Sequence, residues 1–147
     1  MKILLAIDGS PYSKKMLAYL CAHDELINAG RNTFTALTVL PAIPPRARAV
    51  LSKEMVDEYY REEGAKVLDP VRKYLEQSCI FPKERLEVGH PGDIIASIAE
   101  DEKYDLIIMG THGHGALGRL VMGSVSTQVP VSYTKLTLPR TGECCTW

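Results

Sequence analysis

The stretch Lys2-Ile-Leu-Leu-Ala-Ile-Asp-Gly-Ser-Pro11 decides the fold of this 147-residue chain. Its apolar run, residues 2–7, is typical of a short strand that is covered on both faces, as in a parallel sheet. Asp8-Gly9 ends the run, and Ser10-Pro11 supplies a helix N-cap followed by a residue well tolerated at the first helical position. The stretch therefore predicts a buried strand that turns directly into a helix over about residues 11–29.

Strands and helices alternate along the rest of the chain. Further strands are predicted at 33–40, 84–88 and 105–109, and further helices at 51–79 and from Pro91 onward. Parallel neighbours need crossover connections, so this order predicts an α/β fold with an open, doubly wound parallel sheet of about five strands and helices on both faces. Such sheets bind ligands at the carboxyl ends of their strands.

Two details of the helices are predicted from single residues. Gly64 and Pro70 lie inside the long helix and are expected to kink or divide it. The apolar positions of that helix include Met55 and Tyr59, and we interpret Tyr59, Tyr60 and Tyr74 as packing residues.

Composition excludes several classes of protein. Seventeen Lys and Arg against eighteen Asp and Glu give a net charge of −1, and 46% of the residues are hydrophobic, as in an average globular domain. This argues against disorder and against a basic nucleic-acid surface. No transmembrane segment or signal peptide is predicted, so the expected location is cytoplasmic, with no membrane partner.

The cysteines predict no metal site or disulfide framework, because none of the four forms a CxxC pair. Cys21 and Cys79 fall on apolar helix faces and are expected to be core residues. His112 and His114 are two residues apart on a glycine-rich loop without a convergent carboxylate or thiolate, so metal ligation by them is not expected.

A glycine-rich loop follows the last clear strand: Gly110-Thr-His-Gly-His-Gly-Ala-Leu-Gly-Arg119, and then Gly123-Ser-Val-Ser126. Glycines let the backbone approach a ligand closely, and backbone N–H groups with hydroxyls at a helix start suit phosphate oxygens. The loop has no Walker A lysine. Residues 113–118 match GxGxxG, but the position of the expected acidic residue about twenty further on is Leu138. We therefore predict a nucleotide phosphate site of another type.

These motifs resemble the universal stress protein family. Gly110-x2-Gly113-x9-Gly123-Ser124 matches the pattern of its ATP-binding members without a mismatch, and the strand that ends in Asp8 is also similar. The resemblance covers about residues 1–129, which we take as the domain. It implies the Rossmann-like fold of adenine nucleotide alpha hydrolases and a cytoplasmic stress-response module that binds ATP with Mg²⁺, hydrolyses it slowly or not at all, and forms a homodimer.

The resemblance also implies a set of nucleotide-binding residues and no catalytic ones. Backbone at Ile7 and Val39 and the Asp8 carboxylate would face adenine and ribose. The residues expected near the phosphates are Gly110, His112, Gly113, Arg119, Gly123, Ser124, Val125 and Ser126. No metal ligands are expected beyond a Mg²⁺ ion carried by the nucleotide.

The resemblance ends near Pro130. Residues 130–147 are foreign to the family pattern, and we interpret them as an atypical tail that is either an edge strand over 131–138 or an artefact of frameshift or adapter sequence. Family dimers often pair through the last strand, so the tail weakens the expectation of a homodimer.

Two other functions fit the sequence. The first is a phosphatase or nucleotidyl-transferring enzyme of similar topology that uses Asp8 or His112 as its reactive group. The second is an interaction protein that binds no nucleotide.

Overall fold

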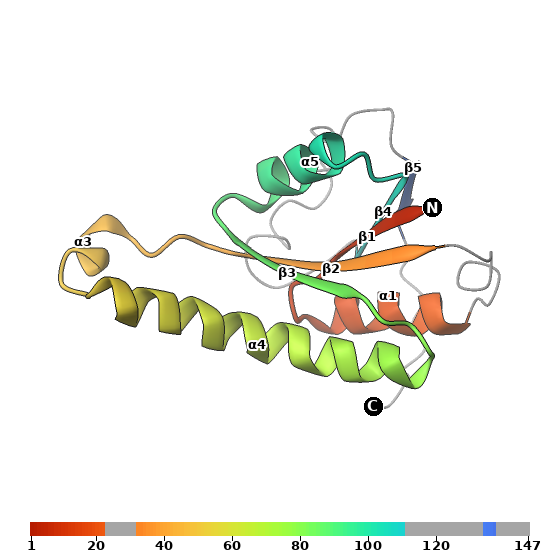
Figure 1. Ribbon diagram of the computed structural model, residues 1–147, viewed down its shortest axis with the longest axis horizontal. Coiled ribbons are helices and arrows are strands. Elements are labelled where there is room, and N and C mark those ends of the chain that lie inside the picture. Colours follow the sequence, from red (N-terminus) through yellow and green to blue (C-terminus); the bar gives the residue numbers. More distant parts are fainter. Residues whose placement is uncertain (23–31, 111–133, 138–147) are drawn as a thin grey trace.

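The computed structural model describes residues 1–22 and 32–110 and the backbone of residues 134–137. It contains a five-stranded sheet in the order β3-β2-β1-β4-β5 (Figure 1). The strands are β1 Lys2–Ala6, β2 Thr33–Leu40, β3 Lys83–Val88, β4 Leu106–Met109 and β5 Thr134–Thr137. The helices are α1 Pro11–Ala22, α3 Pro45–Arg48, α4 Lys53–Gln77 and α5 Pro91–Asp101. This confirms the predicted open α/β fold.

Every neighbouring pair of strands is parallel. In the centre of the sheet, Leu4 of β1 lies opposite Thr35 of β2 on one side and Ile107 of β4 on the other. β5 pairs with β4 at the edge, within the stretch 131–138 that we expected as an edge strand. The central β1 is buried from Ile3 to Ala6, because helices cover both faces of the sheet.

Two hydrophobic clusters fill the space on either side of the sheet. Alternate residues of β1 point to opposite faces: Ile3 and Leu5 join one cluster, and Leu4 and Ala6 join the other. The first cluster packs against α1 and α4, and the second against α5. Figure 1 shows the resulting layers, with α5 above the sheet and α1 and α4 below it.

The long helix α4 is continuous from Lys53 to Gln77, so Gly64 and Pro70 do not divide it, which was one of the two outcomes predicted. It continues through Pro70, whose ring is exposed, because Leu68 and Val71 on either side of it are buried in the core. This packing outweighs the cost of an internal proline, about 3 kcal/mol. Gly64 allows close approach to β3: an added Cβ would lie 2.7 Å from Leu86 Cδ2.

Three sequence predictions about side chains were wrong. Met55 is 57% exposed and Tyr59 is 49% exposed, because the first turns of α4 project beyond the sheet. Cys79 is exposed because it lies just after the end of α4, where the chain reverses with a φ of 58°. Cys21 packs against the core as expected. The structure also contains the short helix α3, for which no helix was predicted and which begins with Pro45.

Candidate functional site

The order of the strands places a switch point at the carboxyl end of β1, which is where the ligand crevice of open α/β sheets lies. The chain leaves β1 through α1 to β2 on one side, whereas β4 lies on the other side. Ligands of open α/β sheets bind at such a switch point, where the connections diverge. Ala6 and Met109 form the last pair of the β1–β4 ladder, so the next residues, Ile7-Asp8 and Gly110, emerge side by side at this edge.

The Asp8 carboxylate is held at the crevice by the first turn of α1. Its Oδ1 accepts hydrogen bonds from the Ser10 backbone N–H (2.9 Å) and the Ser13 hydroxyl (2.6 Å). Ser10 in turn caps α1, since its Oγ accepts from the Ser13 N–H at 3.3 Å. In the described part of the chain, no hydrogen bond reaches Asp8 Oδ2. The turn thus fixes the carboxylate while one of its oxygens stays available.

Gly110 packs against the start of α1. A Cβ at this position would lie 3.2 Å from the backbone carbon of Tyr12 and 3.3 Å from its carbonyl oxygen. A Cβ at these distances would be closer than an ordinary van der Waals contact, and the backbone of Tyr12 cannot easily move to make room for it. The first glycine of the predicted phosphate loop therefore begins directly beside the helix turn that holds Asp8.

Ile7 and Val39 contribute their side chains to the core. Ile7 is fully buried on the α1 and α4 face, and Val39 is buried on the α5 face. The Ile7 N–H donates to the Leu37 carbonyl at 2.9 Å, so it is already satisfied within the sheet. Because both side chains are buried, only the main chain of Ile7 and Val39 can face a ligand, as the predicted backbone role requires.

The remaining predicted site residues lie outside the described residues. They are His112, Gly113, Arg119, Gly123, Ser124, Val125 and Ser126. The structure therefore brings together Ile7, Asp8 and Gly110, with Val39 at the end of the adjoining strand. Their roles stay predictions.

The described residues contain no cluster of three or more His, Cys, Asp or Glu side chains that would hold a metal ion by themselves. Asp8 offers a carboxylate at this edge of the sheet. A magnesium ion is often held by one or two carboxylates together with nucleotide phosphates, and Asp8 fits that part. Across the same described stretches, none of the helices has the length and apolar character that a bilayer crossing requires.

A second feature lies beyond the carboxyl end of β2 and was not predicted. We call it the α3–α4 groove: an apolar hollow of about 470 Å³ lined by residues 41–44, Leu51, Met55 and Tyr59. The sequence signal was present in the prolines and apolar residues between β2 and α4. It was missed because the apolar periodicity of α4 suggested that its first turns lie against the core.

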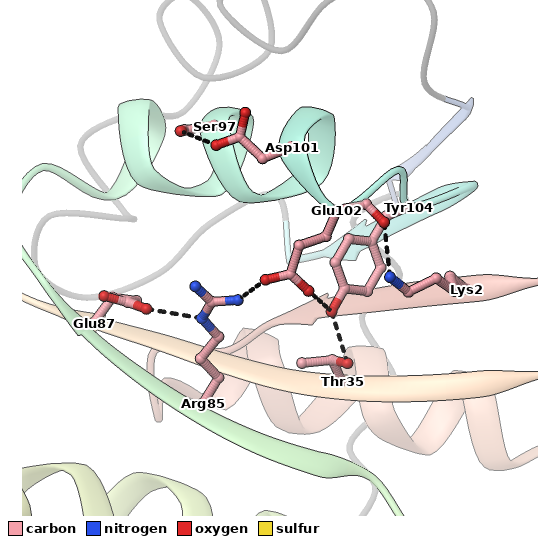
Figure 2. A network of polar contacts seen from close by, with 8 residues as sticks. All are labelled: Lys2, Thr35, Arg85, Glu87, Ser97, Asp101, Glu102 and Tyr104. Carbon is pink, nitrogen blue, oxygen red and sulfur yellow. Dashed lines mark hydrogen bonds and ion pairs between the residues drawn. The ribbon is translucent and has the colours of Figure 1, made fainter.

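A polar network begins at the amino end of β4 and extends over β2 and β3 on the α5 side of the sheet (Figure 2). The Tyr104 hydroxyl donates to Thr35 Oγ1 at 2.9 Å, and Arg85 bonds to both Glu87 and Glu102. The hydrogen bond from Arg85 holds the pKa of Glu102 below its usual value. The pKa of Arg85 is raised by its hydrogen bond to Glu87, which has the larger effect, and by its hydrogen bond to Glu102. The members bond to one another, so the network is structural and carries no candidate site.

The fold and the residues at its switch point define a class: a doubly wound α/β protein with a held carboxylate and a glycine where its two central strands end. A model of the universal stress protein family matches residues 1–130. Universal stress protein MJ0531 of Methanocaldococcus jannaschii is 30% identical over 128 residues, which cover 87% of this chain and 74% of the relative. The chain spans 38% of Slr1230, a universal stress protein of Synechocystis. The chain belongs to the universal stress protein family.

Solved structures share the fold. The structure of protein MJ0577 is 28% identical, has a TM-score of 0.72 and matches 97% of both chains. A universal stress protein family protein from Arabidopsis thaliana with AMP bound has a TM-score of 0.63 at 14% identity, over 95% of this chain and 93% of that one. Complexes with cAMP and dAMP have TM-scores of 0.64 and 0.56 at 19% and 18% identity. At these lower identities the likeness shows the fold alone.

Proposed function

We propose that this chain is an ATP-binding universal stress protein, a regulatory module whose output depends on nucleotide binding and not on fast turnover. The observation that carries the proposal is the placement of Asp8 and Gly110 side by side at the switch point. Asp8 is fixed through Oδ1 with Oδ2 uncommitted, and Gly110 opens the glycine loop on the adjacent strand. Adenine nucleotides in related structures support the ligand class.

In this proposal Asp8 and the loop that begins at Gly110 bind different parts of the nucleotide. Asp8 would accept hydrogen bonds from a ribose or help hold Mg²⁺, and the loop from Gly110 to Ser126 would receive the phosphates. Magnesium supplies charge neutralisation of the triphosphate when it is bound. Hydrolysis, if present, is slow in this proposal, because the sequence offers no acidic pair or phosphate-loop lysine.

The proposal also includes a cytoplasmic location and a homodimer. β5 is the outermost strand of the described sheet, and the unpaired outer side of an edge strand is a ready surface for pairing with a second copy. Domain limits of 1–129 and a tail of 130–147 remain part of the proposal. Comparison of the genomic sequence with the tail distinguishes a natural edge strand from a sequence artefact.

Thermal unfolding with and without millimolar Mg-ATP tests the nucleotide site, with wild type and Gly113→Val side by side. A ligand at about a hundred times its Kd adds about 2.7 kcal/mol, which is several degrees for a domain of this size. We expect a shift in the wild type that the variant loses. A cooperatively unfolding wild type without a shift rejects ATP binding. Rapid phosphate release that disappears in Asp8→Ala would instead support the enzyme alternative.

A further inference from the structure

Ser13 is not among the nucleotide-binding residues predicted from the sequence, yet its hydroxyl makes two hydrogen bonds to Asp8. The hydroxyl donates to Asp8 Oδ1 at 2.6 Å, and its oxygen accepts from the Asp8 backbone N–H at 3.2 Å. A serine hydroxyl has a single hydrogen to donate, so that hydrogen is committed to the carboxylate. Because both bonds end on one residue, they fix the Asp8 side chain relative to its own backbone.

The Ser13 hydroxyl is not needed to begin α1. In a capping box, the side chain of the third helical residue bonds back to the N–H of the capping residue. Here Asp8 Oδ1 accepts from the Ser10 N–H at 2.9 Å instead, and Ser10 Oγ accepts from the Ser13 N–H at 3.3 Å. Both hydrogen bonds that the Ser13 hydroxyl makes within the described chain go to Asp8, so its role concerns the carboxylate and not the helix cap.

Burial strengthens the bond between Ser13 and Asp8. Ser13 is 3% exposed, so water has little access to replace its hydroxyl, and hydrogen bonds to a charged group are stronger than neutral ones. Ser97 and Asp101 on α5 form a pair of the same kind at 3.0 Å, but both residues are exposed to water, which competes for the bond. Of the two pairs, the buried one is therefore the one that holds its carboxylate in place.

The same turn of α1 supports the neighbouring strand. The Tyr12 backbone, next to Ser13 in the chain, packs against Gly110, so one turn sets the position of both groups at the switch point. Side chains that bind a ligand are commonly aimed by hydrogen bonds from residues behind them. We propose that Ser13 is a positioning residue of the nucleotide site, which holds Asp8 by Oδ1 and so keeps Oδ2 for the nucleotide or its Mg²⁺. This inference rests on the proposed function.

A double-mutant cycle tests whether Ser13 acts through Asp8. Calorimetric titration with Mg-ATP measures the Kd of the wild type, Ser13→Ala, Asp8→Ala and the double variant. We expect Ser13→Ala to raise the Kd roughly tenfold, as when a hydrogen-bonded support of a metal-binding side chain is removed. In the Asp8→Ala background the same substitution should leave the Kd unchanged, because no carboxylate is left to position. A purely structural role would weaken binding equally in both backgrounds, so equal effects overturn the inference.

Two serine variants serve as controls. Ser97→Ala removes the matched exposed hydroxyl from Asp101 and should leave the Kd unchanged. Ser10→Ala removes the cap of α1 but neither bond between Ser13 and Asp8, so it should lower the free energy of unfolding and weaken binding less than Ser13→Ala does. Binding weakened as much by Ser10→Ala as by Ser13→Ala would overturn the inference, because the turn as a whole would then set the affinity.

The remaining outcomes separate the inference from the proposed function. A wild type that binds no Mg-ATP overturns the proposed function and this inference with it. A wild type that binds, with the same Kd in Ser13→Ala, overturns the inference alone. Circular dichroism checks that each variant is folded. If Ser13→Ala does not fold, Ser13→Cys takes its place, because a thiol fills the site but donates weakly, and we expect a rise in Kd of at least about threefold.

Discussion

The polar network that begins at the amino end of β4 and the candidate site at the carboxyl end of β1 use polar residues differently. From the amino end of β4, Tyr104 and Glu102 bond to each other, to Thr35 of β2 and to Arg85 of β3. At the carboxyl end, the Asp8 carboxylate is anchored through one oxygen only, beside a glycine. Closed networks hold a fold together, whereas an anchored group with spare bonding capacity is what a ligand needs.

The network and the candidate site also differ in how far apart their residues lie in the sequence. The amino-end network joins residues far apart in sequence, such as Thr35 and Tyr104, which are 69 positions apart. The carboxyl-end site begins with Asp8, Ser10 and Ser13, which lie within a single turn. Removing a member of the network leaves buried partners unsatisfied, so mutations there should reduce stability most, whereas mutations at Asp8 should mainly affect binding.

The largest expected effect is at the amino end. Tyr104 is 4% exposed, its hydroxyl bonds to Thr35, and Lys2 Nζ lies 4.6 Å from its ring centroid. Truncation in Tyr104→Ala leaves a cavity and should lower the free energy of unfolding by about 3–5 kcal/mol, measured by urea denaturation. Tyr104→Phe keeps the ring and should cost about 1 kcal/mol. Equal losses in both variants would show that packing of the ring contributes nothing.

The next effect is on binding, at the carboxyl end. Asp8→Asn keeps an Oδ1 acceptor for Ser10 and Ser13 but removes the charge. We expect the unfolding free energy to change by about 1 kcal/mol or less, while the Kd for Mg-ATP rises at least tenfold, about 1.4 kcal/mol. Calorimetric titration measures the Kd. The matched control is Glu100→Gln, an exposed acid on α5, which should leave both quantities unchanged. Unaltered affinity in Asp8→Asn would remove Asp8 from the site.

Local signals made the carboxyl end predictable. The apolar run of β1, its Asp8-Gly9 stop and the Ser10 cap act over a few residues, so the sequence alone indicated strand, turn and helix. The same holds for the α/β alternation, which fixed the sheet as parallel. The predicted Ser10 cap is confirmed by its bond to the Ser13 N–H.

The amino end and α4 were less predictable because their structure depends on tertiary contacts. Nothing near Tyr104 in sequence indicates that its hydroxyl meets Thr35. The apolar residues Met55 and Tyr59 fit the helical period of α4, yet the helix extends beyond the sheet and leaves them exposed. Of the kink or division predicted from Pro70, the division does not occur, because core packing on both sides of it holds the helix together. The end of the helix predicted over 51–79 was placed to within two residues, whereas the helix from Pro91 was given no end, and Lys103 rather than glycine lies after it.

The ends of α4 and α5 both lie at the amino end of the sheet, just before β3 and β4, and they share one type of cap. After α4, the Ile80 N–H donates to the Leu75 carbonyl and the Cys79 N–H to Glu76, and after α5 the same pattern joins Tyr104 to Ala99. This is a Schellman cap, in which the residue with positive φ is usually glycine. Cys79 and Lys103 occupy it at φ of 58° and 53°.

Glycine at these caps should therefore stabilise the protein. Cys79→Gly relieves the left-handed strain of an exposed residue and should raise the unfolding free energy by about 1 kcal/mol, as should Lys103→Gly. Urea denaturation measures both. Ser78→Gly is the matched control: its φ is −97°, so glycine there gains nothing and adds flexibility to the unfolded chain. Stabilisation by Ser78→Gly as large as by Cys79→Gly would contradict the strain argument.

The smallest effect is the pH dependence of the amino-end network. The hydrogen bond from Arg85 lowers the pKa of Glu102 in the folded protein. The carboxylate therefore adds stability above its unfolded pKa of about 4.3, and that contribution is lost as the pH falls through the lower folded value. Glu102→Gln removes the charge at every pH. The wild type should be the more stable of the two at pH 7, and the difference should shrink toward zero as both are acidified below pH 4. Denaturation at a series of pH values measures it, and a difference that stays constant across the acid range would mean that Glu102 acts by packing and not by its charge.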